Sequence, residues 1–228
     1  MSTQQIIRTA ESVTQSHPDK VCDQISDAIL DACLKDDPMS RVAVETMGGH
    51  GIISITGELT TKTYVNMRAI AQQVYKDCGY NENIGVNVNV VEQSPEIAAG
   101  VNQDGAGDQG IMVGYATAET PEMLPLEVML SRHLARAMGP RDGKSQVTVQ
   151  GGKVLSFITS VCAPDAASEA ALEAAVAKHI TPILAPGVDL KKAWLRNPNG
   201  KWDIGGFAAD TGLTGRKLAV DTYGHSIP

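Results

Sequence analysis

The stretch SHPDKVCDQISDAILDACLKDDP, residues 16–38, predicts a long helix that begins on a charged, exposed turn. Pro18 has the fixed φ that suits the first helical position, so His17 or Ser16 caps the helix. Apolar residues recur at helical spacing and place one face against a core. They are Val21, Ile25, Ala28, Ile29, Ala32 and Cys33. Pro38 ends the helix.

The first turn of this helix is a candidate site for phosphate and metal. An imidazole, a carboxylate and an ammonium lie within four positions, in His17, Asp19 and Lys20. The free N–H groups of the turn face outward at the positive end of the helix dipole. A solvated helix start with ordinary capping and charge fits the same residues, so both interpretations stay open on this segment alone.

Composition narrows the class of protein. The chain has 228 residues, 43% of them hydrophobic and 20% charged, which is ordinary for a soluble globular protein. A formal charge of −7 and the absence of any Lys/Arg run argue against nucleic acid as the main partner. No apolar run approaches membrane-spanning length, and the first residues do not resemble a signal peptide. We therefore expect a cytoplasmic protein that binds neither nucleic acid nor membrane.

The four cysteines predict a reducing compartment. They lie far apart in sequence, without a C-x-x-C pair or a neighbouring histidine at metal-ligand spacing. Buried, unpaired thiols in a reducing environment explain them most simply.

Hydrophobic periodicity along the chain predicts two similar groups of elements. The first has a helix at 18–37, strands at 42–47 and 52–58, a helix at 67–78 and a strand at 84–90. The second has strands at 146–150 and 154–162, a helix at 167–183 and a strand at 193–195. This order indicates an α+β fold built from repeated units, each a β-sheet with helices packed on one face.

A domain boundary is expected at Gly139-Pro140, after a helix predicted at 125–138. Residues 1–139 then form the first α+β unit and residues 140–228 the second.

Three polar segments combine glycine with charged residues, at 93–110, 141–145 and 210–217. Glycine lets backbone approach a ligand, although tight turns also use it for conformational reasons alone. No nucleophile–base pair and no zinc pattern can be argued from spacing. Surplus charge of both signs on loops instead suits chemistry by positioning and by neutralising a polyanionic group with metal ions and cations.

Several motifs, taken in order, resemble one family. They are SHPDK at 16–20, GE at 57–58, QSP at 93–95, GAGDQG at 105–110, KSQVT at 144–148 and GLTGRK at 212–217, followed by VDTYG at 220–224. This combination resembles methionine adenosyltransferase, also called S-adenosylmethionine synthetase, over nearly the whole chain. The resemblance implies a cytoplasmic transferase of S-adenosylmethionine biosynthesis in one-carbon metabolism. Its substrates would be ATP and L-methionine, with Mg²⁺ and K⁺ as cofactors.

In that family the methionine sulfur attacks C5′ of ATP, and the triphosphate leaves and is hydrolysed. The resemblance implies that His17 contacts the bridging oxygen or the triphosphate. It implies that Lys144, Arg216 and Lys217 bind the triphosphate. Asp19 would ligate Mg²⁺, which prefers carboxylate and phosphate oxygens.

The same resemblance assigns the remaining metal and methionine residues. Glu45 matches the potassium site. Glu58 and Gln93 would hold methionine, and Asp108 would lie at its ammonium group.

The nucleoside and the far end of the site are assigned in the same way. Asp142 would bind ribose hydroxyls, and Asp210 would reach the methionine end. Trp202 would stack on adenine, although packing at an interface or edge also explains a tryptophan there.

The resemblance also carries expectations about the rest of the molecule. The segment 95–104 matches a loop that covers the site, in a form shorter than is usual in the family. The family's third unit is expected to be absent, so the site would be completed by a separate chain or by a further part of the same protein. The alternative is a non-catalytic homologue or a binding and assembly subunit. At least a homodimer is expected.

Overall fold

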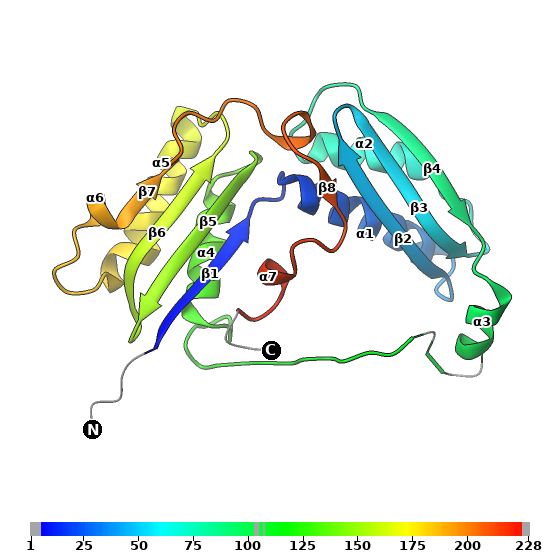
Figure 1. Ribbon diagram of the computed structural model, residues 1–228, viewed down its shortest axis with the longest axis horizontal. Coiled ribbons are helices and arrows are strands. Elements are labelled where there is room, and N and C mark those ends of the chain that lie inside the picture. The colour runs from blue at the N-terminus through cyan, green and yellow to red at the C-terminus, as the bar shows by residue number, and fades with distance from the viewer. Residues whose placement is uncertain (1–5, 103–104, 107, 225–228) are drawn as a thin grey trace.

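Two four-stranded sheets, each covered by helices on one face, make up the molecule (Figure 1). A computed structural model describes residues 6–102, 105–106 and 108–224. The architecture is α+β, as the periodicity predicts. Within these residues no helix is both long and apolar enough to cross a membrane.

The first sheet has the order β4-β3-β2-β8. Its strands are β2 (Arg41–Gly49), β3 (Ile52–Thr60), β4 (Gly85–Val91) and β8 (Gly212–Leu213). The hairpin of β2 and β3 is antiparallel, β4 adds in parallel to β3, and β8 adds in antiparallel to β2. Helices α1 (Pro18–Asp36) and α2 (Met67–Asp77) bury their apolar stripes against one face, leaving the other face open.

The second sheet repeats this topology in the order β1-β5-β6-β7. Its strands are β1 (Ile7–Val13), β5 (Gly143–Gln150), β6 (Lys153–Val161) and β7 (Trp194–Arg196). Again a central antiparallel hairpin carries an antiparallel strand on one side and a parallel strand on the other. Its core contains residues of α4 (Leu126–Ala137), α5 (Ala166–Ala175) and the π-helical turn η1 (Val176–Ile180).

The two sheets do not divide the chain at Gly139-Pro140. Strand β1 and helix α4 precede that point but pack in the second unit, whereas β8 follows it and pairs with β2. The expected division into residues 1–139 and 140–228 therefore does not coincide with the observed sheets. Strand β1 joins the sheet of β5, β6 and β7, and β8 joins the sheet of β2, β3 and β4. The chain therefore passes from one sheet to the other near both of its ends (Figure 1).

Short elements complete the chain. They are α3 (Pro95–Val101), η2 (Thr181–Ile183), α6 (Leu190–Ala193), η3 (Gly206–Ala208) and α7 (Leu218–Asp221). The expected covering loop at 95–104 is thus helical as far as Val101, and its residues 103–104 lie outside the described part. The predicted helix at 167–183 is α-helical only to Ala175 and continues as η1 and η2.

Candidate functional site

His17 forms the start of α1, as its sequence predicts. Its backbone is extended, with φ −63° and ψ 136°, and Pro18 follows in the first turn. The imidazole Nδ1 accepts a hydrogen bond from the Asp19 N–H at 3.2 Å. Since Nδ1 is an acceptor, the neutral ring carries its proton on Nε2, which is then available as a donor.

Burial, aided by two nearby cations, keeps the His17 imidazole neutral. The side chain is 3% exposed. Burial lowers the pKa of His17 to about 4, with further lowering by the positive charges of Lys217 and Lys144. Asp19 and Asp210 act in the opposite direction. These interactions place two predicted cations and two predicted acids around one imidazole.

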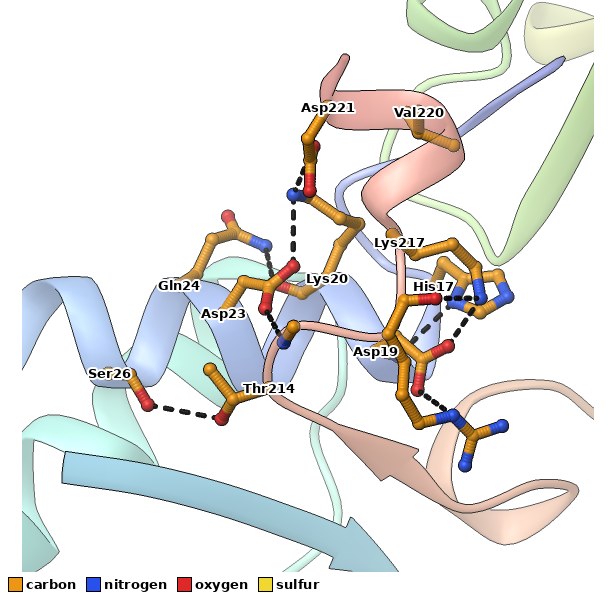
Figure 2. Close-up of polar contacts among 12 residues, drawn as sticks. His17, Asp19, Lys20, Asp23, Gln24, Ser26, Thr214, Lys217, Val220 and Asp221 are labelled. Atoms are coloured by element: carbon orange, nitrogen blue, oxygen red, sulfur yellow. Dashed lines mark hydrogen bonds and ion pairs between the residues drawn. The ribbon is translucent and has the colours of Figure 1, made fainter. Parts of the chain in front are cut away.

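Asp19 is a buried carboxylate that holds three partners. One oxygen accepts the Leu213 N–H at 2.9 Å and lies 3.6 Å from Arg216 Nε. The other is paired with Lys217 Nζ (Figure 2). Burial raises the pKa of Asp19, but the hydrogen bonds from Lys217 and the Leu213 N–H outweigh that effect and leave the pKa below its ordinary value. The carboxylate thereby fastens the segment after β8 to the beginning of α1.

Glycine makes this close approach possible. A Cβ on Gly212 would lie 2.2 Å from the carbonyl oxygen of Pro18, so no larger residue fits without moving backbone. The next residue after Asp19, Lys20, forms ion pairs at 3.0 Å with both Asp23 and Asp221 (Figure 2). Asp23 also accepts the Gly215 N–H at 2.9 Å.

Asp142 lies immediately before β5 and is 5% exposed. Its Oδ2 accepts the Gly206 N–H at 2.8 Å, whereas its buried Oδ1 has no hydrogen-bond partner among the described residues. Burial raises the pKa of Asp142 above its ordinary value. The Gly206 N–H and Lys144 lower it, and Asp210 raises it further. Lys144 and Asp210 therefore influence both His17 and Asp142.

Seven predicted site residues thus converge between the two sheets. We call them the α1 cluster: His17, Asp19, Asp142, Lys144, Asp210, Arg216 and Lys217.

Backbone hydrogen bonds hold the segment that contains Trp202 near Asp142. Its carbonyl accepts the Ala163 N–H at 2.7 Å, and the N–H of the preceding Cys162 donates to the Asp142 carbonyl at 2.8 Å. The indole N–H donates to the Ile204 carbonyl at 2.7 Å. The backbone that carries this half-buried ring therefore lies near Asp142, which is predicted to bind the nucleoside.

Glu45 and Glu58 lie elsewhere, on the open face of the first sheet. Glu45 is opposite Thr56 and Glu58 is opposite Ala43, and both side chains are exposed. Glu58 is also in register with Val91, two residues before Gln93, so these two methionine candidates share one end of the sheet. The buried Gln93 Oε1 has no hydrogen-bond partner within the described part of the chain. No hydrogen bond or ion pair among the described residues joins these three side chains to the α1 cluster.

Asp108 is also apart from the cluster. It lies on the exposed stretch after α3, and its carboxylate accepts the N–H of the next residue, Gln109, at 2.7 Å. Figure 1 shows this stretch running in extended form along one side of the molecule toward α4. Gly107 of the GAGDQG motif lies outside the described residues.

The donor set limits how a metal ion could bind. In the described ranges no group of three His, Cys, Asp or Glu side chains is arranged to hold one. Asp19 supplies one carboxylate, which fits Mg²⁺ only as an ion that brings phosphate oxygens as its other ligands. Glu45 is a single exposed carboxylate on the open sheet face.

Sequence reasoning missed the aromatic contacts behind the cluster. Tyr80 donates its hydroxyl to the Ser16 carbonyl, directly before His17. Its ring stacks on Tyr75 with centroids 4.8 Å apart, and Tyr75 stacks on Phe207 at 5.4 Å. A Cβ on Gly206 would lie 2.3 Å from the Tyr80 ring. Ser16, Phe207 and Gly206 all lie far from Tyr80 in sequence. The only local signal for these contacts is an aromatic residue, Tyr80, directly after Gly79 at the end of a helix.

Comparisons with known proteins identify the family of the chain. The S-adenosylmethionine synthetase N-terminal domain matches residues 5–99, and the central domain matches residues 103–202. Relatives named S-adenosylmethionine synthase are 40% identical over 260 residues in Parafrankia sp. (strain EAN1pec) and 42% over 256 in Desulforudis audaxviator (strain MP104C). Each alignment covers 95% of this chain and 65% of the relative, so the chain spans about two thirds of the length of these proteins. The chain belongs to the S-adenosylmethionine synthetase family.

Proposed function

We propose that this chain binds ATP and methionine and takes part in forming S-adenosylmethionine. The methionine sulfur forms a bond to C5′ of the ribose while the C5′–O bond breaks, and the triphosphate leaves with the electron pair. The observation that carries the proposal is the α1 cluster, in which a neutral histidine and three cations converge at a helix start.

The cluster suits a triphosphate leaving group. His17 offers its Nε2–H as a neutral donor, and Lys144, Arg216 and Lys217 offer positive charge to phosphate oxygens. A thioether sulfur has a free lone pair, so the reaction requires no general base. Stabilising the departing charge and holding the sulfur in line with C5′ are the main tasks, and fixed cations perform the first of them.

Metal ions would assist at two of the predicted positions. Mg²⁺ carried by the triphosphate would neutralise part of its charge, and Asp19 is the carboxylate in reach of such an ion. Binding then requires the carboxylate to be shared with Lys217 and Arg216, its partners in the free chain. We propose Glu45 for K⁺ on the basis of the family motif.

Asp142 and Trp202 would hold the nucleoside. The buried Oδ1 of Asp142 lacks a partner, and a ribose hydroxyl would supply the missing donor. Trp202 stands close by with a half-buried ring suited to stacking on adenine.

Methionine would be held by Glu58, Gln93, Asp108 and Asp210. Of these, only Asp210 belongs to the α1 cluster, so one copy of the chain does not bring the set together. We propose that a second copy, paired through the open sheet faces, contributes the other three residues. A homodimer or higher oligomer is therefore part of the proposal.

The test is formation of S-adenosylmethionine from ATP, methionine, Mg²⁺ and K⁺. The reaction is run with this chain alone. It is then run with this chain plus a polypeptide that corresponds to the part of a relative outside the alignment. ATP affinity is measured in parallel by calorimetry, with Lys217→Met as the cluster variant and the exposed Lys35→Met as its matched control. The proposal predicts that only Lys217→Met weakens ATP binding, by tenfold or more. ATP binding without product in any combination would instead support a binding subunit, and unchanged affinity in Lys217→Met would refute the site.

A further inference from the structure

A polar cavity that is not part of the α1 cluster lies between the end of β1, the last turns of α4 and the turn at Gly139-Pro140. Its volume is about 340 Å³. Ser12, Thr14 and Gln15 line it from the end of β1 and the residues that follow, and Arg132 and Arg136 line it from α4. None of these residues belongs to the α1 cluster.

The two arginines give the cavity an unbalanced positive charge. They lie one helical turn apart on α4, and neither forms an ion pair with a residue in the described ranges. Arg132 Nη2 donates to the Val220 carbonyl at 3.1 Å, which satisfies one donor without neutralising the charge. Burial lowers the pKa of Arg132, and the charge of Arg136 lowers it further. Asp221 opposes this, but its carboxylate is already paired with Lys20 at 3.0 Å.

Thr14 adds a buried hydroxyl without a partner. The side chain is 3% exposed, and its Oγ1 forms no hydrogen bond with the described residues. Its backbone is fixed, since its N–H donates to the Gly143 carbonyl at 3.0 Å and its carbonyl accepts the His17 N–H at 3.2 Å. A buried hydroxyl in this state is costly unless a ligand or water completes it.

We propose that this cavity binds a small phosphate-type oxyanion, either inorganic phosphate or the phosphate group of a small phosphomonoester. Two guanidinium groups on one wall match the planar, forked geometry with which arginine grips phosphate oxygens. The Thr14 hydroxyl would donate to the same anion from the opposite wall. The site is separate from the proposed ATP site, and its occupation does not depend on catalysis.

The experiment is a titration of the full chain with inorganic phosphate, followed by the amide resonances of Thr14, Gln15 and Gly139. Glycerol 3-phosphate is titrated in the same way, and chloride at equal ionic strength is the control. Both phosphate compounds are expected to shift the three resonances saturably, and chloride is not. Tighter binding of glycerol 3-phosphate indicates a phosphomonoester as the ligand, and equal binding indicates the free ion.

Variants locate the binding. The double substitution Arg132→Gln with Arg136→Gln should weaken phosphate binding at these resonances by about tenfold or more. Thr14→Val should weaken it about fivefold, and Thr14→Ser should restore it. Arg68→Gln, on an exposed position of α2, is the matched control and should bind normally. Lys217→Met should lose ATP affinity but retain phosphate binding here, which separates this inference from the proposed function.

Three results would overturn the inference. The first is an equal response to chloride and phosphate. The second is phosphate affinity at Thr14 that is unchanged in the double arginine variant. The third is loss of the Thr14 response in Lys217→Met, which would assign the anion to the α1 cluster.

Discussion

The α1 cluster and the open face of the first sheet both carry carboxylates predicted to bind ligands, but in opposite environments. Asp19 is 1% exposed and is held by a backbone N–H and two cations. Glu45 and Glu58 are exposed carboxylates on a flat strand surface. In one copy of the chain the residues proposed to bind the triphosphate are therefore already held together, whereas two of the acids predicted for potassium and methionine lie exposed on an open sheet face.

The largest expected difference between the two regions is in stability. Replacing Asp19 with Ala leaves Lys217 partly buried without its counter-charge and removes the acceptor of the Leu213 N–H. We expect a loss of about 4 kcal/mol in the free energy of unfolding. Glu45→Ala, on the open face, should change it by less than about 0.5 kcal/mol. Urea unfolding of both variants measures this contrast, and similar losses would contradict it.

The next largest expected difference between the two regions is in the pH dependence of stability. Burial holds the folded pKa of His17 at about 4, below the ordinary value of 6.5. Between these values only the unfolded chain takes up the proton, so stability is full above pH 6.5 and falls as the pH drops toward 4. The loss should amount to about 3 kcal/mol. Urea unfolding at pH 7 and pH 4.5 should show this slope in the wild type and a flatter one in His17→Gln, and equal slopes would refute it.

The two regions should also differ in how much stability is lost when a glycine is replaced by alanine. Gly212→Ala places a methyl group against the Pro18 carbonyl, so it should destabilise the fold by about 2 kcal/mol. Gly51 lies in the β2–β3 turn with φ 84°, and a Cβ there meets nothing within 4 Å. Gly51→Ala should cost about 1 kcal/mol from backbone strain alone. Thermal unfolding of the two variants is the measurement, and a larger effect at Gly51 would contradict the account.

The smallest expected effect is at Tyr80. Tyr80→Phe keeps the stacked ring but removes the hydroxyl that donates to the Ser16 carbonyl. We expect a loss of about 1 kcal/mol in stability and weaker ATP binding, because the start of α1 is less firmly held. Calorimetry with ATP measures the second effect. Unchanged affinity would show that Tyr80 supports the fold and not the site.

Local signals made much of the fold predictable. The cap at His17, the helix after it and the hairpins at 48–51 and 151–153 follow from residues close in sequence. Strands β1 and β8 were missed, because β1 is largely polar and β8 has only two residues. Both are defined by pairing with distant strands. The same crossing makes the expected boundary at Gly139 differ from the observed division between the sheets.

The sequence supplied candidate site residues but not their arrangement. Motifs and family resemblance selected the residues, yet nothing in the sequence indicates that Asp19 meets Lys217, about 200 positions away. Alternation along β3 places Glu58 on the face opposite the buried Ile53 and Ile55, but it does not indicate that this face lies away from His17. Long-range convergence and burial determine these positions, and neither is a local property of the chain.

The most direct test of the central claim is the pKa of the His17 imidazole, measured by NMR in the free chain and with bound ATP, with His17→Gln as the assignment control. Without ligand, the pKa of the His17 imidazole should be about 4. The pKa should rise clearly when the negative triphosphate offsets Lys144 and Lys217. If ATP binds and the pKa of His17 stays the same, the triphosphate does not lie in the α1 cluster and the account is wrong.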